Sequence, residues 1–70
     1  MQHRDTQGKA TSQVLAHVER ARTSIKGVND SNVSTDGIFF NPQTTLASVK
    51  VAREELNKAI AIMERTKWKA

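Results

Sequence analysis

The most constraining feature of this sequence is residues 42–66, which contain no glycine and have a proline only at the first position. Apolar residues recur within this run at spacings of three and four, the period that places side chains on one face of an α-helix. The positions are 46, 49, 53, 56, 60 and 63; five of them are apolar and the sixth is Arg53. Asn41 suits the N-cap, and Pro42 suits the first turn, where its missing N–H costs nothing. We therefore predict a helix over about residues 42–66.

A second apolar pattern with helical spacing precedes this run. Its positions are Val14, Val18, Ala21, Ile25 and Val28. Thr11 or Ser12 could cap its beginning through a side-chain oxygen, and Gly27 suits a left-handed residue at its end. The pattern predicts a first helix over about residues 11–27.

Residues 28–41 separate the two patterns and are rich in Asn, Asp and Ser, which favour turns over helix. Their acidic part resembles the opening of a calcium-binding loop, but Thr35 stands where that loop needs glycine and Asn41 where it needs glutamate. We expect a solvated loop without a metal. The predicted fold class is all-α, with residues 1–70 forming one domain, an antiparallel helical hairpin.

The chain is short for a stable single core. It has 70 residues, no cysteine, and Phe39, Phe40 and Trp68 as its only aromatic residues. Chains of this size usually need a disulfide, a metal or oligomerisation to gain enough buried surface. Alanines in the second helix, such as Ala52 and Ala59, would let another helix approach closely. We therefore expect a homo-oligomer, at least a dimer, that covers the remaining apolar face.

Chemistry at a catalytic site is not indicated. Glu54 and Glu55 are adjacent and so point in different directions on a helix, while Glu54 and Lys58 have the spacing of a surface ion pair. His17 borders the first apolar stripe without a nucleophile in a recognisable setting. We expect no enzymatic activity and no cofactor. The polar N-terminus and the lack of any apolar run of about 20 residues predict a cytoplasmic protein without a membrane partner.

The formal net charge of +4 favours an anionic partner, although solubility alone also explains it. Arg53 is the distinctive cation because it interrupts an apolar seam. It either pairs with a carboxylate such as Glu19 or one on a partner chain, or faces an anion-binding pocket between subunits. In the second case the neighbouring cations would join Arg53 as ligand-binding residues; they are Arg22, Lys26 and Lys50. Arginine suits phosphate because its planar fork donates two hydrogen bonds.

The C-terminal segment "TKWKA" leaves two interpretations open. Trp68 stands between Lys67 and Lys69, so it could stack on a nucleic-acid base. It could also pack against a neighbouring subunit.

Residues 49–65, "VKVAREELNKAIAIMER", resemble the second hairpin helix of small phage anti-defence proteins that sequester cyclic nucleotide signals of CBASS and Thoeris immunity. The resemblance rests on an aliphatic–Ala–Arg step, a bulky residue, a small residue, and an apolar–basic end. These are Val51, Ala52, Arg53, Leu56, Ala59, Met63 and Arg65. It covers about a quarter of the chain. Glu54 departs from the pattern, because a small hydroxyl residue is expected after the arginine and a carboxylate there would repel a phosphate.

The resemblance implies a non-enzymatic helical oligomer that binds a cyclic nucleotide between subunits in the cytoplasm of a bacterial host. Arg53 would then contact a ligand phosphate. The alternative hypothesis is a helical protein-interaction module, such as an inhibitor, adaptor or assembly factor that binds a host protein and no small molecule.

Overall fold

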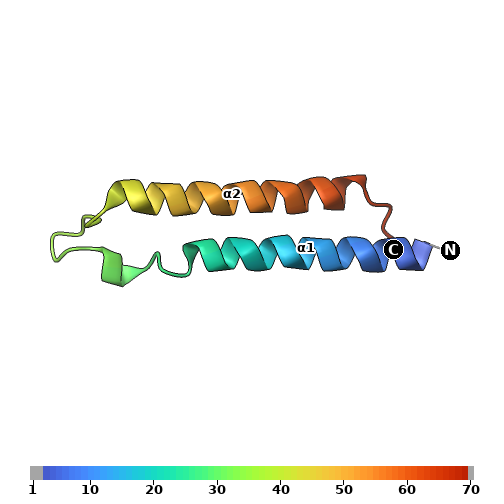
Figure 1. Ribbon diagram of the computed structural model, residues 1–70, viewed down its shortest axis with the longest axis horizontal. Coiled ribbons are helices and arrows are strands. Elements are labelled where there is room, and N and C mark those ends of the chain that lie inside the picture. Colours follow the sequence, from blue (N-terminus) through green and yellow to red (C-terminus); the bar gives the residue numbers. More distant parts are fainter. Residues whose placement is uncertain (1–2, 70) are drawn as a thin grey trace.

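The computed structural model describes residues 3–69, and of residues 3–5 only the backbone. Two antiparallel helices, α1 (His3–Ile25) and α2 (Pro42–Arg65), form a hairpin that measures 56 × 17 × 15 Å (Figure 1). The connection between them contains one short 3-10 helix, η1 (Asp30–Asn32). No residue from 3 to 69 belongs to a named β-strand. The predicted all-α fold class and the helical hairpin are therefore confirmed.

Helix α1 begins at His3, so the predicted start near residue 11 is wrong, and neither Thr11 nor Ser12 caps the helix. The N-terminal extension is polar, which hides its helical character in the sequence. Nevertheless it makes contacts across the hairpin: Ala10 is buried, and the Gln7 Oε1 atom accepts a hydrogen bond at 3.3 Å from the backbone N–H of Lys69, on the segment that follows α2. These contacts therefore extend α1 beyond its apolar pattern.

Both ends of α2 follow the prediction closely. Asn41 is the N-cap, its side-chain oxygen accepting from the Thr44 N–H at 3.4 Å, and Pro42 is the first helical residue. At the other end the Thr66 hydroxyl donates to the Ile62 carbonyl. Such bonds satisfy backbone groups that a helix end leaves without partners.

The connection between the helices is mostly exposed, as expected for a solvated loop, and hydrogen bonds also hold its backbone. Asn29 caps η1, with the side chains of Asn29 and Asn32 bonded reciprocally to backbone N–H groups. Gly37 has a φ of 81°, which favours glycine, in the turn between Val33 and Phe39, which form an isolated antiparallel bridge. Gly27 was expected to be the left-handed C-cap of the first helix. That expectation is wrong, because Gly37 is the glycine with positive φ in the described chain.

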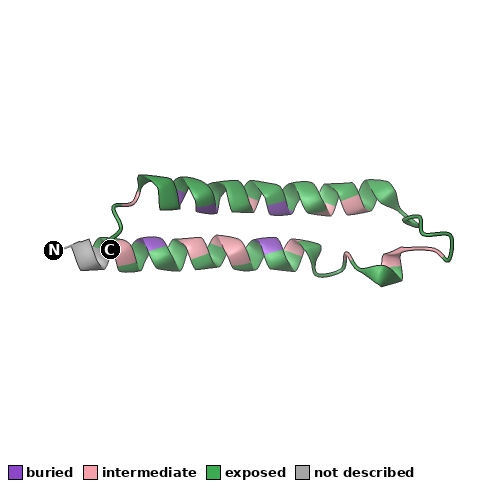
Figure 2. Ribbon diagram, turned by 180° about the vertical axis from the view of Figure 1, so that it is seen from behind, coloured by how far each residue is buried: buried purple, intermediate pink, exposed green. Residues whose placement is uncertain are grey.

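The helices pack along a seam of small residues, which we call the packing seam. Its buried members are Ala10, Ala21, Ala52, Ala59 and Ile62. They alternate along each helix with half-buried residues such as Val14, His17 and Glu55. Figure 2 shows buried and intermediate residues on the sides of α1 and α2 that face each other. Small side chains let helix axes approach closely, but they remove little apolar surface from water.

The large apolar residues lie elsewhere, on one outer side of the hairpin that we call the apolar face. Its members are Leu15, Ile25, Leu46, Val49, Leu56, Ile60 and Met63, each between 39% and 62% exposed. The predicted seam through positions 46, 49, 53, 56, 60 and 63 thus forms part of this face, and all six of its residues are exposed. It is displaced by one residue from the packing seam of α2, a rotation of about 100°.

The hairpin consequently exposes more surface than a compact protein of the same mass. Its accessible area is 5679 Å², whereas a compact protein of 7.8 kDa exposes roughly 4,400 Å². The excess follows from the elongated shape and from the outward position of the apolar face.

Candidate functional site

The apolar face contains a groove between the two helices, with a volume of about 480 Å³. Its lining residues come from the end of α1, the adjoining turn and the middle of α2. They are Ile25, Val28, Val49, Ala52, Arg53, Leu56, Asn57 and Ile60. Arg53 is the one charged residue among them. The groove therefore combines apolar walls with a single guanidinium group.

Arg53 has no ion pair within residues 6–69. The predicted alternative of a salt bridge from Arg53 to Glu19 in the same chain is therefore wrong. The reason is geometric: Arg53 belongs to the outward seam of α2, so it points away from the packing seam where the helices exchange contacts. A cation in this position is available to an anion from outside the hairpin.

The other three predicted ligand-binding residues are all exposed but occupy different places. Arg22 precedes Ile25 by three residues, so it projects from the same side of α1 as that groove residue. Lys50 follows Val49 directly, which places it about 100° around α2 from that groove residue. Lys26 lies one residue beyond the end of α1, in the turn that follows the helix. The fold thus brings Arg22 and Arg53 to the apolar face, with Lys26 and Lys50 on its flanks.

A second polar arrangement lies in the packing seam and centres on Glu55, whose side chain is 16% exposed. The His17 Nδ1 atom donates to the Glu55 Oε1 atom at 2.7 Å, joining α1 to α2. Arg20 Nη1 lies 3.8 Å from the same oxygen, and Lys58 Nζ lies 3.9 Å from Oε2. The predicted ion pair between Glu54 and Lys58 is therefore replaced by one between Glu55 and Lys58.

These neighbours lower the pKa of Glu55 below its ordinary value of 4.5. The hydrogen bond from His17 is the largest cause, because it favours the charged carboxylate. Electrostatic interactions with Lys58, His17 and Arg20 also lower the Glu55 pKa, and desolvation opposes them. Glu55 is therefore an acceptor that connects the two helices in its ionised form, with its charge already compensated.

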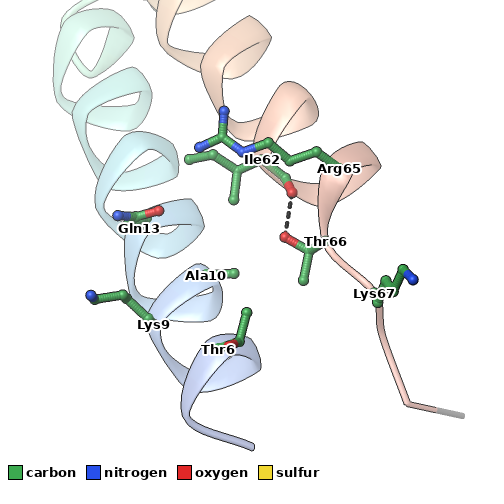
Figure 3. A pocket seen from close by; sticks show the side chains of 8 residues that line it. All are labelled: Thr6, Lys9, Ala10, Gln13, Ile62, Arg65, Thr66 and Lys67. Atoms are coloured by element: carbon green, nitrogen blue, oxygen red, sulfur yellow. Dashed lines mark hydrogen bonds between the residues drawn. The ribbon is translucent and has the colours of Figure 1, made fainter. Parts of the chain in front are cut away.

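A basic pocket of about 430 Å³ lies at the end of the hairpin opposite the connecting loop. Its lining residues are Thr6, Lys9, Ala10, Gln13, Ile62, Arg65, Thr66 and Lys67. Ala10, Ile62 and Thr66 lie between the helices, while Lys9 and Lys67 lie on opposite sides of the opening (Figure 3). Three cations and no carboxylate line this pocket.

Sequence reasoning missed this pocket, although it noted Arg65 and Lys67 near the C-terminus. Lys9 precedes the predicted first helix of about residues 11–27, so nothing in the sequence connects it with the end of the second helix. The antiparallel pairing of the helices brings these residues together, and no local pattern signals that pairing.

Trp68 lies beside the basic pocket on the segment that follows α2. Its indole N–H donates to the Met63 carbonyl at 2.9 Å, and the side chain remains 42% exposed. Gln7, Lys67 and Lys69 line a smaller depression with it. The ring is held against the helix end by a hydrogen bond while much of its surface stays open.

The described residues contain no group of three or more His, Cys, Asp or Glu side chains that could hold a metal ion. Over the same residues, neither α1 nor α2 combines the length and hydropathy of a membrane span. Comparison of the chain with protein-family models, curated proteins and solved structures finds no match.

Proposed function

We propose that this protein is a non-enzymatic binding protein that self-associates through its apolar face and sequesters an anionic cyclic nucleotide signal between copies. The observation that carries the proposal is Arg53, a cation without an ion pair in the described structure, set in an otherwise uncharged groove. Covering Arg53 by apolar surface alone would bury an uncompensated charge, which costs several kcal/mol. A phosphate in the covered groove would compensate it.

The exposed surface supports self-association. Two separate hairpins expose more surface than one compact protein of twice the mass would. The difference, about 4,100 Å², is the total area that two copies would have to bury on association. This value lies within the roughly 2,000–5,000 Å² range of obligate homodimer interfaces. The outward positions of α2 also repeat at spacings of three and four, the pattern with which helices interlock in coiled coils and bundles.

Two-fold symmetry would give the ligand matched donors. A symmetric interface contains every residue twice, so Arg53 and Arg22 would each contribute two guanidinium groups. A cyclic nucleotide with two phosphates has a corresponding arrangement of charges. The flanking residues Lys26 and Lys50 would add longer-range attraction to the same ligand.

The experiment is a thermal-shift panel with cyclic di- and trinucleotides, cyclic ADP-ribose isomers and linear nucleotides. A ligand at a hundredfold excess over its Kd stabilises the folded protein by about 3 kcal/mol. Arg53→Gln should abolish the shift for the active ligand without dissociating the assembly. Lys9→Gln removes the same charge from the basic pocket and should leave the shift intact.

Two other results would contradict the sequestering function, and the second would favour a protein-interaction module. If no nucleotide shifts the melting temperature of the wild-type protein, the sequestering function is wrong. If Arg53→Gln instead abolishes binding of a partner helix to the groove, the protein is an interaction module of the helix-in-groove type.

A further inference from the structure

We propose that the basic pocket and the adjoining Trp68 form a binding site for single-stranded nucleic acid. The pocket supplies cations for backbone phosphates, and Trp68 supplies a surface on which a base stacks. This combination of a positive groove with an exposed aromatic ring is the usual design of single-strand binding sites.

The charges of the pocket form no ion pair with residues 6–69. They belong to Lys9, Arg65 and Lys67, whereas the acidic partner in every ion pair of residues 6–69 is Glu55. Arg65 can donate two hydrogen bonds to one phosphate, and each lysine acts as a point charge. The volume of about 430 Å³ lies within the range of ligand pockets, roughly 300–1,000 Å³.

The C-terminal end of α2 repels an anion less than an uncapped helix C-terminus would. Terminal carbonyl groups normally give that end a negative partial charge. Here the Thr66 hydroxyl donates to the Ile62 carbonyl and the Trp68 indole donates to the Met63 carbonyl. Two of the last carbonyls therefore already have donors, and Arg65 and Lys67 add positive charge at this end of the helix.

Trp68 is held in position for stacking before any ligand binds. The indole N–H bond fixes the ring against α2, and the Lys69 N–H bond to Gln7 ties the following residue to α1. Lys67 and Lys69 adjoin the ring in the same depression, which has a volume of about 170 Å³. A small phosphate would need only the cations. The fixed and exposed ring is what favours a nucleic-acid strand.

This site is separate from the groove of the proposed sequestering function. Lys9 and Gln13 directly precede Ala10 and Val14 of the packing seam, whereas the groove residue Ile25 directly follows the half-buried Ser24. The two sets therefore lie on opposite sides of α1. A second copy on the apolar face would leave the basic pocket open. The two proposals can therefore fail independently.

The sole tryptophan of the chain provides the readout, because the sequence contains no tyrosine. Oligothymidylate of about eight nucleotides, within the 4–16-nucleotide span typical of single-strand sites, should quench Trp68 fluorescence in a saturable titration at low salt. The double variant Lys9→Gln, Arg65→Gln should weaken binding about tenfold and reduce the salt slope by about 1.4, since each phosphate contact contributes about 0.7. Circular dichroism checks that the variant keeps its helix content.

A matched control separates this site from the rest of the surface. The double variant Arg20→Gln, Lys58→Gln removes two positive charges from exposed side chains outside the pocket and the groove, and it should retain the wild-type affinity for oligothymidylate. Absence of quenching, or equal affinity in the pocket variant, would overturn the proposal. Equal affinity for thymidine monophosphate or pyrophosphate would also overturn it, by showing a small phosphate site. Equal binding of polyaspartate would show unspecific attraction to polyanions and contradict it as well.

Discussion

At the scale of single residues, the charge of Glu55 connects the two helices, whereas the charge of Arg53 has no ion pair in residues 6–69. The two residues are two positions apart in α2, and a helix turns about 200° over that interval. One therefore enters the packing seam and the other the apolar face. Position around the helix, more than residue type, decides which charge is structural and which is available.

Acid should weaken the hairpin through Glu55. Because the folded pKa of this carboxyl is depressed, its contribution to stability is complete above the ordinary value of 4.5 and is lost as pH falls through the lower folded pKa. Urea unfolding of wild type between about pH 6 and pH 3 should show this loss, whereas Glu55→Gln should lack that part of the pH dependence. Glu54→Gln, a neighbour outside the ion-pair network, should behave as wild type. Identical pH profiles for wild type and Glu55→Gln would refute the role assigned to this residue.

At the scale of helices, the existence and order of α1 and α2 could be predicted from apolar spacing and from Asn41–Pro42 at the start of α2. The packing seam could not. Two seams with spacings of three and four run along α2, one through Ala52, Ala59 and Ile62 and one through the larger apolar residues. Hydrophobic size favours the second seam, but close helix approach selects the first. The tertiary contact therefore overrides the stronger local pattern.

The same limit applies to the candidate sites. The sequence identified Arg53 because the cation interrupts a local pattern. The interaction of His17 with Glu55 and the pocket shared by Lys9 and Arg65 depend on pairing between distant segments. Only the register of the hairpin brings these residues together, so no local feature predicts them.

Replacing an alanine by leucine should destabilise the protein in the packing seam but not on the solvent side of the same helix. Ala59 is 5% exposed, whereas Ala61 is an exposed residue two positions later. Ala59→Leu should lower the free energy of unfolding by about 1–3 kcal/mol through overpacking. Ala61→Leu should change it by less than about 0.5 kcal/mol. Urea unfolding followed by circular dichroism measures both, and equal losses would show that the seam is misplaced.

At the scale of the whole molecule, one hairpin has a thin core and an extensive apolar face. Self-association predicts a melting temperature that rises with protein concentration, because mass action favours the folded oligomer. Leu56→Glu introduces a charge into the groove and should give a monomer in sedimentation equilibrium. Val51→Glu is the matched control, since Val51 is 50% exposed and does not line the groove. A wild-type protein that stays monomeric with a constant melting temperature would exclude self-association.

The antiparallel pairing also predicts the sequence in which contacts between the two helices form and break. The contact between His17 and Glu55 spans 38 positions of the chain, and that between Gln7 and Lys69 spans 62. Contacts between more distant positions close a longer loop at a higher entropic cost. Pairs near the connection should thus form first, and the far end should close last and reopen most often. Amide hydrogen exchange should accordingly be faster around Lys9 and Arg65 than around Ala21 and Ala52, because the end of the hairpin that contains the basic pocket opens more often than the end near the connection.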